Sequence, residues 1–214
     1  MASQVSHIVY AKKYFDRLDK IGSDENNIPP KKLDRDEFLL GCVFPDIRRI
    51  DSNITRKETH LKFDPVDLNF SKLSSFEAGW KFHLYCDMKR EEILNAHKFY
   101  EIAGAGDFYG QAAKSLEDEL VYDEYNNWEK IRHYFNNPPR IENGINVEIE
   151  TFNLWYAILS KYFEKKPDEK SLRIFFTKQP HHQSNINELM ESTFSLGKNK
   201  KAVEILEKVS EEIV

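Results

Sequence analysis

The sequence predicts an all-α protein that folds as a single compact domain of many helices. Apolar residues recur three or four positions apart along most of the chain, and no alternating strand pattern persists beyond a few residues. Glycine and proline are few, with eight of each among 214 residues. Both observations favour helices over sheets or low-complexity structure. We expect one domain over residues 1–214, because no linker is long enough to separate independent domains.

The first expected helix covers residues 4–19, where Val5, Ile8, Val9 and Phe15 fall on one face. A loop rich in Ser, Asp, Asn and Pro follows at 22–30, and then a short helix at about 34–42. Residues 46–70 have no sustained period and predict a long irregular connection, of a kind that is often functional.

A helix over 74–90 is expected to begin at Ser74 or Ser75 as its N-cap, with Glu77 nearby. The Pro138–Pro139 pair predicts a break within 136–144. The remaining helices are expected at about 91–103, 108–121, 126–136, 146–164, 169–178, 184–195 and 199–213.

Charge and cysteine content narrow the function classes. The formal net charge is -5 and no basic stripe is present, so nucleic-acid binding is not expected as the main function. A small phosphate-containing substrate stays possible, because a metal ion can supply local positive charge.

Cys42 and Cys86 form no Cys-x-x-Cys pair, which predicts two buried, reduced thiols. No signal-peptide pattern is evident and the longest apolar stretch, 38–44, is too short to cross a bilayer, so we expect a soluble, cytoplasmic protein.

Histidine and aspartate gather in the first ninety residues. His83 and Asp87 lie four apart in a predicted helix, which places both on one face, where they can share a metal ion. Asp46 follows a short helix, His60 lies in the irregular segment, and His7 lies near the start of the first helix. Imidazole and carboxylate together suit Zn²⁺. On spacing alone, hydrogen-bonded core histidines and a local His–Asp contact are the more common explanation of such a pattern.

Four pieces of the sequence occur in the order seen in a known metalloenzyme family. They are Ser6-His7-Ile8, Gly41 to Asp46, Glu58-Thr59-His60 and Gly79 to Asp87. On these pieces the chain resembles the zinc-dependent phospholipase C family, which is related in fold to the S1/P1 nucleases. The resemblance covers residues 1–90 and implies that family's fold and metal ligands at Asp46, His60, His83 and Asp87. It also implies a possible second metal ion that shares Asp87 with His7.

The resemblance also implies up to three zinc ions, with a His-x-x-x-Glu pair among the further ligands. His97 and Glu101 fit that pattern, although they follow Asp87 more closely than the family pattern places them, and a histidine expected between is missing. A plain surface pair on one helix face is the alternative for these two residues. The family's ligand at a processed N-terminus has no counterpart here.

The activity that the resemblance implies is hydrolysis of a phosphodiester, such as a phospholipid, by metal-activated water. Asp46 is the candidate to bind the ion and accept a proton. Arg48, Arg49 and Arg56 are candidates to clamp a phosphate, and Trp80, with Phe44 and Phe63, to wall a substrate pocket. A solvated loop face and ordinary core packing are the alternatives for these two groups.

Two competing functions remain. An HD-type phosphohydrolase requires an adjacent His-Asp pair, which the chain lacks. A non-catalytic binding or scaffold module that keeps a structural or vestigial metal site needs only the fold. Residues 1–110 are expected to carry the metal site and 111–214 to supply packing helices. The sequence leaves the oligomeric state open.

Overall fold

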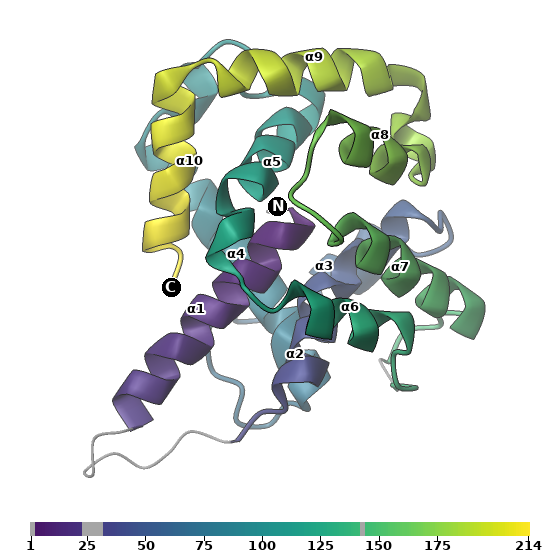
Figure 1. The fold of residues 1–214 in the computed structure, drawn as a ribbon. Helices are drawn as coiled ribbons and strands as arrows, with labels where there is room; N and C mark the ends of the chain where they lie inside the picture. The colour runs from purple at the N-terminus through teal and green to yellow at the C-terminus, as the bar shows by residue number, and fades with distance from the viewer. Residues whose placement is uncertain (1–2, 23–31, 142–143) are drawn as a thin grey trace.

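The computed structural model describes residues 3–22, 32–141 and 144–214 (Figure 1). Within these ranges the chain forms ten α-helices and four short 3₁₀ helices, and no strand, which confirms the all-α prediction. Most of the predicted loop at 22–30 lies outside the described residues. The α-helices are α1 (Gln4–Gly22), α2 (Arg35–Val43), α3 (Arg56–His60), α4 (Ser75–Ala96), α5 (Asp107–Val121), α6 (Trp128–Asn136), α7 (Ile149–Tyr162), α8 (Glu169–Thr177), α9 (Ile186–Gly197) and α10 (Lys200–Glu212).

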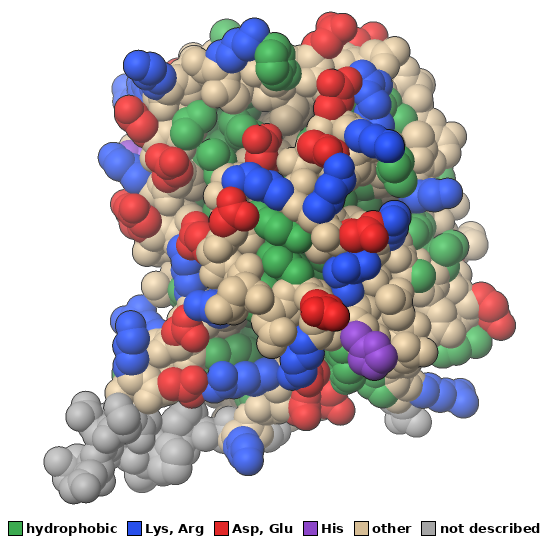
Figure 2. All heavy atoms as spheres, in the orientation of Figure 1, with side chains coloured by type: hydrophobic (Ala, Val, Ile, Leu, Met, Phe, Trp, Pro, Cys, Tyr) green, Lys and Arg blue, Asp and Glu red, His purple; other side chains and the backbone are tan. Residues whose placement is uncertain are grey.

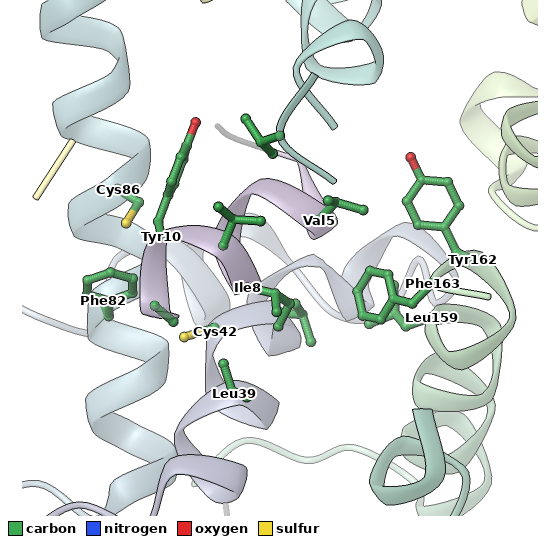
Figure 3. Packing of buried hydrophobic residues seen from close by; sticks show 14 of the residues in the cluster. Val5, Ile8, Tyr10, Leu39, Cys42, Phe82, Cys86, Leu159, Tyr162 and Phe163 are labelled. Atoms are coloured by element: carbon green, nitrogen blue, oxygen red, sulfur yellow. The ribbon is translucent and has the colours of Figure 1, made fainter. Parts of the chain in front are cut away.

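Helices α1, α2 and α4 pack together at the centre of the molecule (Figure 1). The rings of Phe38 from α2 and Phe82 from α4 lie 5.4 Å apart, and Tyr14 from α1 contacts both. Figure 3 shows Ile8 of α1 and Cys42 of α2 in this core, with Leu159 and Phe163 approaching from the α7 side. Cys42 and Cys86 are free and buried, as predicted. Burial raises the pKa of both thiols well above the usual value.

Two glycines let α2 and α4 touch backbone to backbone. A Cβ added at Gly79 on α4 would lie 1.9 Å from the carbonyl oxygen of Phe38, and one added at Gly41 on α2 would lie 2.0 Å from that of Phe76. Any larger residue would therefore hold the two helices apart. Because Asp46 follows α2 and His83 lies one turn after Gly79, this close crossing brings the two side chains near each other.

The predicted N-cap of α4 is confirmed, since Ser74 and Glu77 form a reciprocal capping box. The helix runs on to Ala96, so the separate helix predicted at 91–103 is wrong. Lys98 has a left-handed backbone, with φ of 54°, which ends the helical path. The 3₁₀ helix η2 (Phe99–Glu101) follows in place of a further helical turn.

The segment expected to be irregular is mostly so, but it contains two short helical pieces. Phe44–Arg49 forms the 3₁₀ helix η1 directly after α2, with Pro45 at its start. Helix α3 begins at a Thr55–Glu58 capping box and ends on His60. These two pieces carry Asp46 and His60 against α4.

The second half of the chain encloses the centre on two sides (Figure 1). Helices α5, α9 and α10 pack together, while α6, α7 and α8 form a neighbouring group. Regular helical geometry in α5 begins only after Gly110, because Phe108 and Tyr109 have left-handed backbones. Figure 2 shows both signs of charge interleaved on one face of the molecule. Across the described residues, no helix combines the length and the apolarity that a membrane span requires.

Candidate metal centre

Five side chains from four elements converge at the crossing of α1 and α4. Two overlapping groups have ligand atoms within 4.8 Å of one another and could each hold a metal ion. One group comprises His7, His83 and Asp87, and the other comprises Asp46, His60 and His83. The cluster is deeply buried: His7, His83 and Asp46 have no exposed surface, and the side chain of Asp87 is 11% exposed.

Backbone carbonyls fix the tautomers of two histidines. The Nδ1 atom of His7 lies 2.7 Å from the carbonyl oxygen of Ser3, and that of His83 lies 2.7 Å from the carbonyl oxygen of Cys42. Because a carbonyl can only accept a hydrogen bond, Nδ1 of His83 carries a proton, which leaves Nε2 as the atom that can present a lone pair. His7 contacts a carbonyl with both nitrogens, since its Nε2 lies 3.4 Å from the carbonyl oxygen of His83, and the shorter contact at Nδ1 favours the proton there. The two rings are stacked, 3.9 Å apart and 6° from parallel.

The ring of His60 also directs its Nε2 atom toward the centre of the cluster. Its Nδ1 atom lies 2.8 Å from the hydroxyl of Thr59, which can donate its own proton to the carbonyl of Thr55. Trp80 holds this turn, because its indole N–H donates to the carbonyl of Thr59 at 2.6 Å. The Nδ1–H of His60 can therefore donate to Thr59, which leaves Nε2 as the acceptor.

The three Nε2 atoms face the carboxylate of Asp87. The distances from its nearest oxygen are 3.5 Å for His83, 3.6 Å for His7 and 3.9 Å for His60. In the described part of the chain, Nε2 of His60 and of His83 are buried without a hydrogen-bond partner. Lone pairs that face a carboxylate at this range repel one another unless a cation lies between them. Hydrogen-bonded Nδ1 atoms that orient a ring are also the usual support of a metal-binding histidine.

The ionisation states favour a metal ion over protons. Burial, with the nearby His83, lowers the pKa of both His7 and His60 to about 3. Burial alone would raise the pKa of Asp87, but the electrostatic influence of the surrounding histidine rings holds it well below the usual value. At neutral pH the cluster is thus a set of two neutral imidazoles and an ionised carboxylate around His83.

Asp46 is held by Gln4, which was not predicted at the site, and by Arg49, which was predicted to clamp a phosphate. Gln4 donates to its Oδ2 at 2.6 Å, and Nε of Arg49 lies 3.0 Å from its Oδ1. Burial opposes its ionisation, but Arg49 and the cluster histidines lower the pKa of Asp46 well below the usual value. A carboxylate that stays ionised at neutral pH suits a metal ligand, and the proton-accepting role of Asp46 stays a prediction.

Arg49 is engaged within the protein and not presented to a ligand. Its side chain is 9% exposed and also donates to Gln111 on α5, at 3.1 Å, and to Gln179, at 3.4 Å. Lys114, one turn after Gln111, is also buried, and burial with the nearby Arg49 and Arg90 lowers its pKa to about 8. The second half of the chain therefore contributes to the surroundings of Asp46 and does more than pack.

Arg48 and Arg56 remain accessible beside the cluster. The Arg48 side chain is 20% exposed, and its guanidinium lies 4.0 Å from Asp46. Burial lowers the pKa of Arg48, and Arg56 contributes to the shift, which places the two cations near each other. Arg56 is exposed at the start of α3.

Three other predicted residues lie elsewhere. His97 and Glu101 do not share a helix face, because α4 ends before them. His97 instead lies 3.9 Å from Glu212 of α10, and Glu101 is largely exposed and pairs with Lys98. Trp80 is fully buried among Phe44, Phe63 and Phe76, so it orders the α3 turn and cannot contact a substrate.

Helix α1 is anchored by a second buried polar network. Asp118 on α5 accepts hydrogen bonds from Ser3, Ser6 and Tyr162. The neighbouring Glu117 accepts from Tyr10 and from Arg90, which lies on α4. These contacts fix the turn that carries His7. Sequence periodicity offered no signal for them, since the partners lie 27 to 115 positions apart.

The number of ions follows from the shared ligand. The two candidate groups share His83, whereas a shared Asp87 was expected. Since the Nδ1 of His83 is occupied by a carbonyl, only Nε2 can bind, and one nitrogen binds one ion. The geometry of the described residues therefore fits a single ion better than two or three.

Comparisons with known proteins leave the family open. No protein-family model matches the chain, no curated protein is significantly similar to its sequence, and no solved structure is significantly similar to its fold. The kinship with zinc-dependent phospholipase C therefore remains a hypothesis that rests on the four sequence pieces named above.

Proposed function

We propose that this protein binds one divalent metal ion, with zinc as the best match, and uses it to hydrolyse phosphoester bonds. The convergence of buried imidazole lone pairs on Asp87 is the observation that carries the metal site. Three histidines and two aspartates form the nitrogen–oxygen ligand set that Zn²⁺ accepts. The residues that can supply ligands are His7, Asp46, His60, His83 and Asp87. They form two overlapping groups of three, and an ion held by one group keeps a position for water.

The hydrolytic part of the proposal rests on charge and on motif order. A divalent ion held here would act as a Lewis acid and supply hydroxide near neutral pH. The chain itself contributes an ionised Asp46 as ligand, kept in place by Gln4 and Arg49. Arg48 and Arg56, which are accessible beside Asp46, are the side chains that we assign to a phosphate oxygen. The resemblance to phospholipase C points to a phosphodiester, such as a phospholipid, and to that family's fold type.

A structural metal ion is the second candidate, and one observation favours it. Three of the five ligands have no exposed surface, and a structural zinc site is closed, whereas a catalytic one keeps an open position. The 11% exposure of Asp87 and the 20% exposure of Arg48 are the openings through which a substrate would reach the ion. The two candidates differ in whether metal-dependent turnover accompanies metal binding.

Metal content measured by mass spectrometry tests the site. The protein is purified without chelator and without a histidine tag, beside the variants His83→Ala and Asp46→Asn. We expect about one equivalent of metal in the parent and little in either variant. His97→Ala is the matched control, because His97 follows the same helix but lies outside the cluster. Equal metal in the parent and in His83→Ala would refute the site.

Turnover of bis(p-nitrophenyl) phosphate then separates hydrolysis from a structural role. Metal-dependent hydrolysis that is lost in Asp46→Asn, and reduced in Arg48→Met with metal retained, supports the enzyme. One tightly held ion whose removal lowers the melting temperature, without hydrolysis of any phosphoester tried, supports the structural alternative.

A further inference from the structure

A groove lies between α7 and α8, away from the metal centre. It encloses about 550 Å³, within the range of small-molecule sites, and none of the metal cluster's residues line it. Helix α7 contributes a stripe at helical spacing that includes Leu154, Ile158 and Lys161, and α8 contributes Lys170 and Ile174. The floor is formed by Tyr162 and Phe175, whose rings stack 4.2 Å apart.

The walls of the groove are apolar yet open to solvent. Leu154 is 54% exposed and Ile174 is 43% exposed, and Ile158 between them is half-buried. The hydroxyl of Tyr162 points away into the core, where it donates to Asp118, so its ring offers only an apolar face. Exposed aliphatic side chains around a concavity of this size mark a binding site for an apolar group.

The rim of the groove carries positive charge. Four lysines line it against one glutamate, in a chain whose overall charge is -5. Lys161 pairs with Glu164, and Lys165 pairs with Asp168. Lys170 has no acidic partner within the described part of the chain, and it lies at the end of the groove where α7 turns into α8, beside Lys161 and Lys165. Leu154 lies toward the opposite end, seven residues before Lys161 along the α7 stripe.

We propose that this groove binds a free fatty acid. The carboxylate lies against Lys170 at the α7–α8 turn, and the alkyl chain extends over Ile174 and Ile158 toward Leu154. The groove follows α7 from Leu154 to Tyr162, nine residues and about 12 Å at 1.5 Å per residue, which suits a chain of medium length. The inference does not depend on the hydrolase proposal, because the two sites share no residue.

Isothermal titration with sodium decanoate, below its micelle concentration, tests the groove in the full chain. We expect saturable binding of one decanoate per chain. Affinity should rise from octanoate to decanoate by up to about fourfold per methylene, the equivalent of ~0.8 kcal/mol. Decyltrimethylammonium, with the same chain and the opposite charge, should bind at least about fivefold more weakly.

Paired variants locate the site. Ile174→Gln and Lys170→Gln should each weaken decanoate binding about fivefold or more. Ile149→Gln, equally exposed at 45% on α7 but outside the groove, and Lys201→Gln on α10 should leave it unchanged. All four positions are exposed, so thermal melts should show folded proteins. Binding by His83→Ala as tight as the parent's would confirm that the groove acts independently of the metal centre.

Several results would overturn the proposal. One is the absence of saturable decanoate binding, and another is equal affinity for the ammonium analogue. Binding of an acidic amphipathic peptide in place of decanoate would assign the groove to a protein partner. Self-association in sedimentation velocity that Ile174→Gln abolishes, without decanoate binding, would assign it to a second copy of the chain.

Discussion

Replacing Gly79 by alanine tests how closely α2 and α4 approach. The added methyl carbon would lie 1.9 Å from the carbonyl oxygen of Phe38, and an ordinary contact needs about 3.4 Å. The helices must therefore separate by roughly 1.5 Å, against a backbone atom that cannot rotate away. Overpacking of this kind costs about 1–3 kcal/mol or more, and the gain in helix propensity offsets up to ~1 kcal/mol. Because the contact is with a backbone atom, we expect a net loss at the upper end of this balance, about 2 kcal/mol.

Thermal unfolding of the metal-free protein is the assay. For a chain of this length the loss corresponds to a melting temperature lower by roughly 4–8 °C. Gly197→Ala on α9 is the control, because its methyl group would meet only the flexible side chain of Leu116 at 3.4 Å. Its stability should change by less than about 0.5 kcal/mol. If Gly79→Ala behaves like Gly197→Ala, the backbone contact between α2 and α4 is not as close as described.

Three further predictions concern the buried polar groups. Burial raises the pKa of Asp118 to about 6 from an ordinary 3.8 despite its hydrogen bonds, so its contribution to stability is complete below pH 4 and is lost as the pH rises through 6. Asp118→Asn should remove this pH dependence. The difference between parent and variant in the free energy of unfolding, measured with urea, should therefore change by up to ~3 kcal/mol between pH 4 and pH 7. A difference that stays constant with pH would contradict the prediction. Glu117→Ala leaves Arg90 buried without its partner and should lower the free energy of unfolding by ~3–5 kcal/mol in the same assay. The double variant Arg90→Met/Glu117→Leu, which replaces both charges by apolar side chains, should lose less. The reverse order would argue against a buried ion pair. Zinc at about a hundred times its dissociation constant should stabilise the parent by ~2.7 kcal/mol and Asp46→Asn hardly at all, and equal stabilisation of both would speak against the assigned ligand.

The sequence was most informative where local pattern determines structure. Helix periodicity and the Ser74 capping signal predicted most helices to within a few residues. The spacing of His83 and Asp87 correctly placed both on one helix face. The motif order brought His7, Asp46 and His60 into the same candidate cluster, and the structure does place these residues together.

Long-range partners could not be predicted in this way. Gln4, Gln111 and Gln179 contact the site across 42 to 130 positions, and nothing periodic marks them. The expectation for His97 and Glu101 was wrong because the spacing of four assumes an unbroken helix, which the left-handed Lys98 interrupts. Trp80 was assigned to a pocket wall because composition cannot distinguish a buried aromatic from one that lines a cavity.

The stacked rings of His7 and His83 also limit how protons and metal ions exchange at the centre. Two positive charges 3.9 Å apart repel by about 4 kcal/mol at an effective dielectric constant of 20, so the two rings are not protonated together near neutral pH. With the pKa of His7 and of His60 at about 3, an arriving divalent ion has no proton to displace from either ring. If the cluster binds zinc as proposed, the heat of binding at pH 7 should accordingly be free of a buffer-ionisation contribution from these two residues, because zinc binding would not exchange protons there.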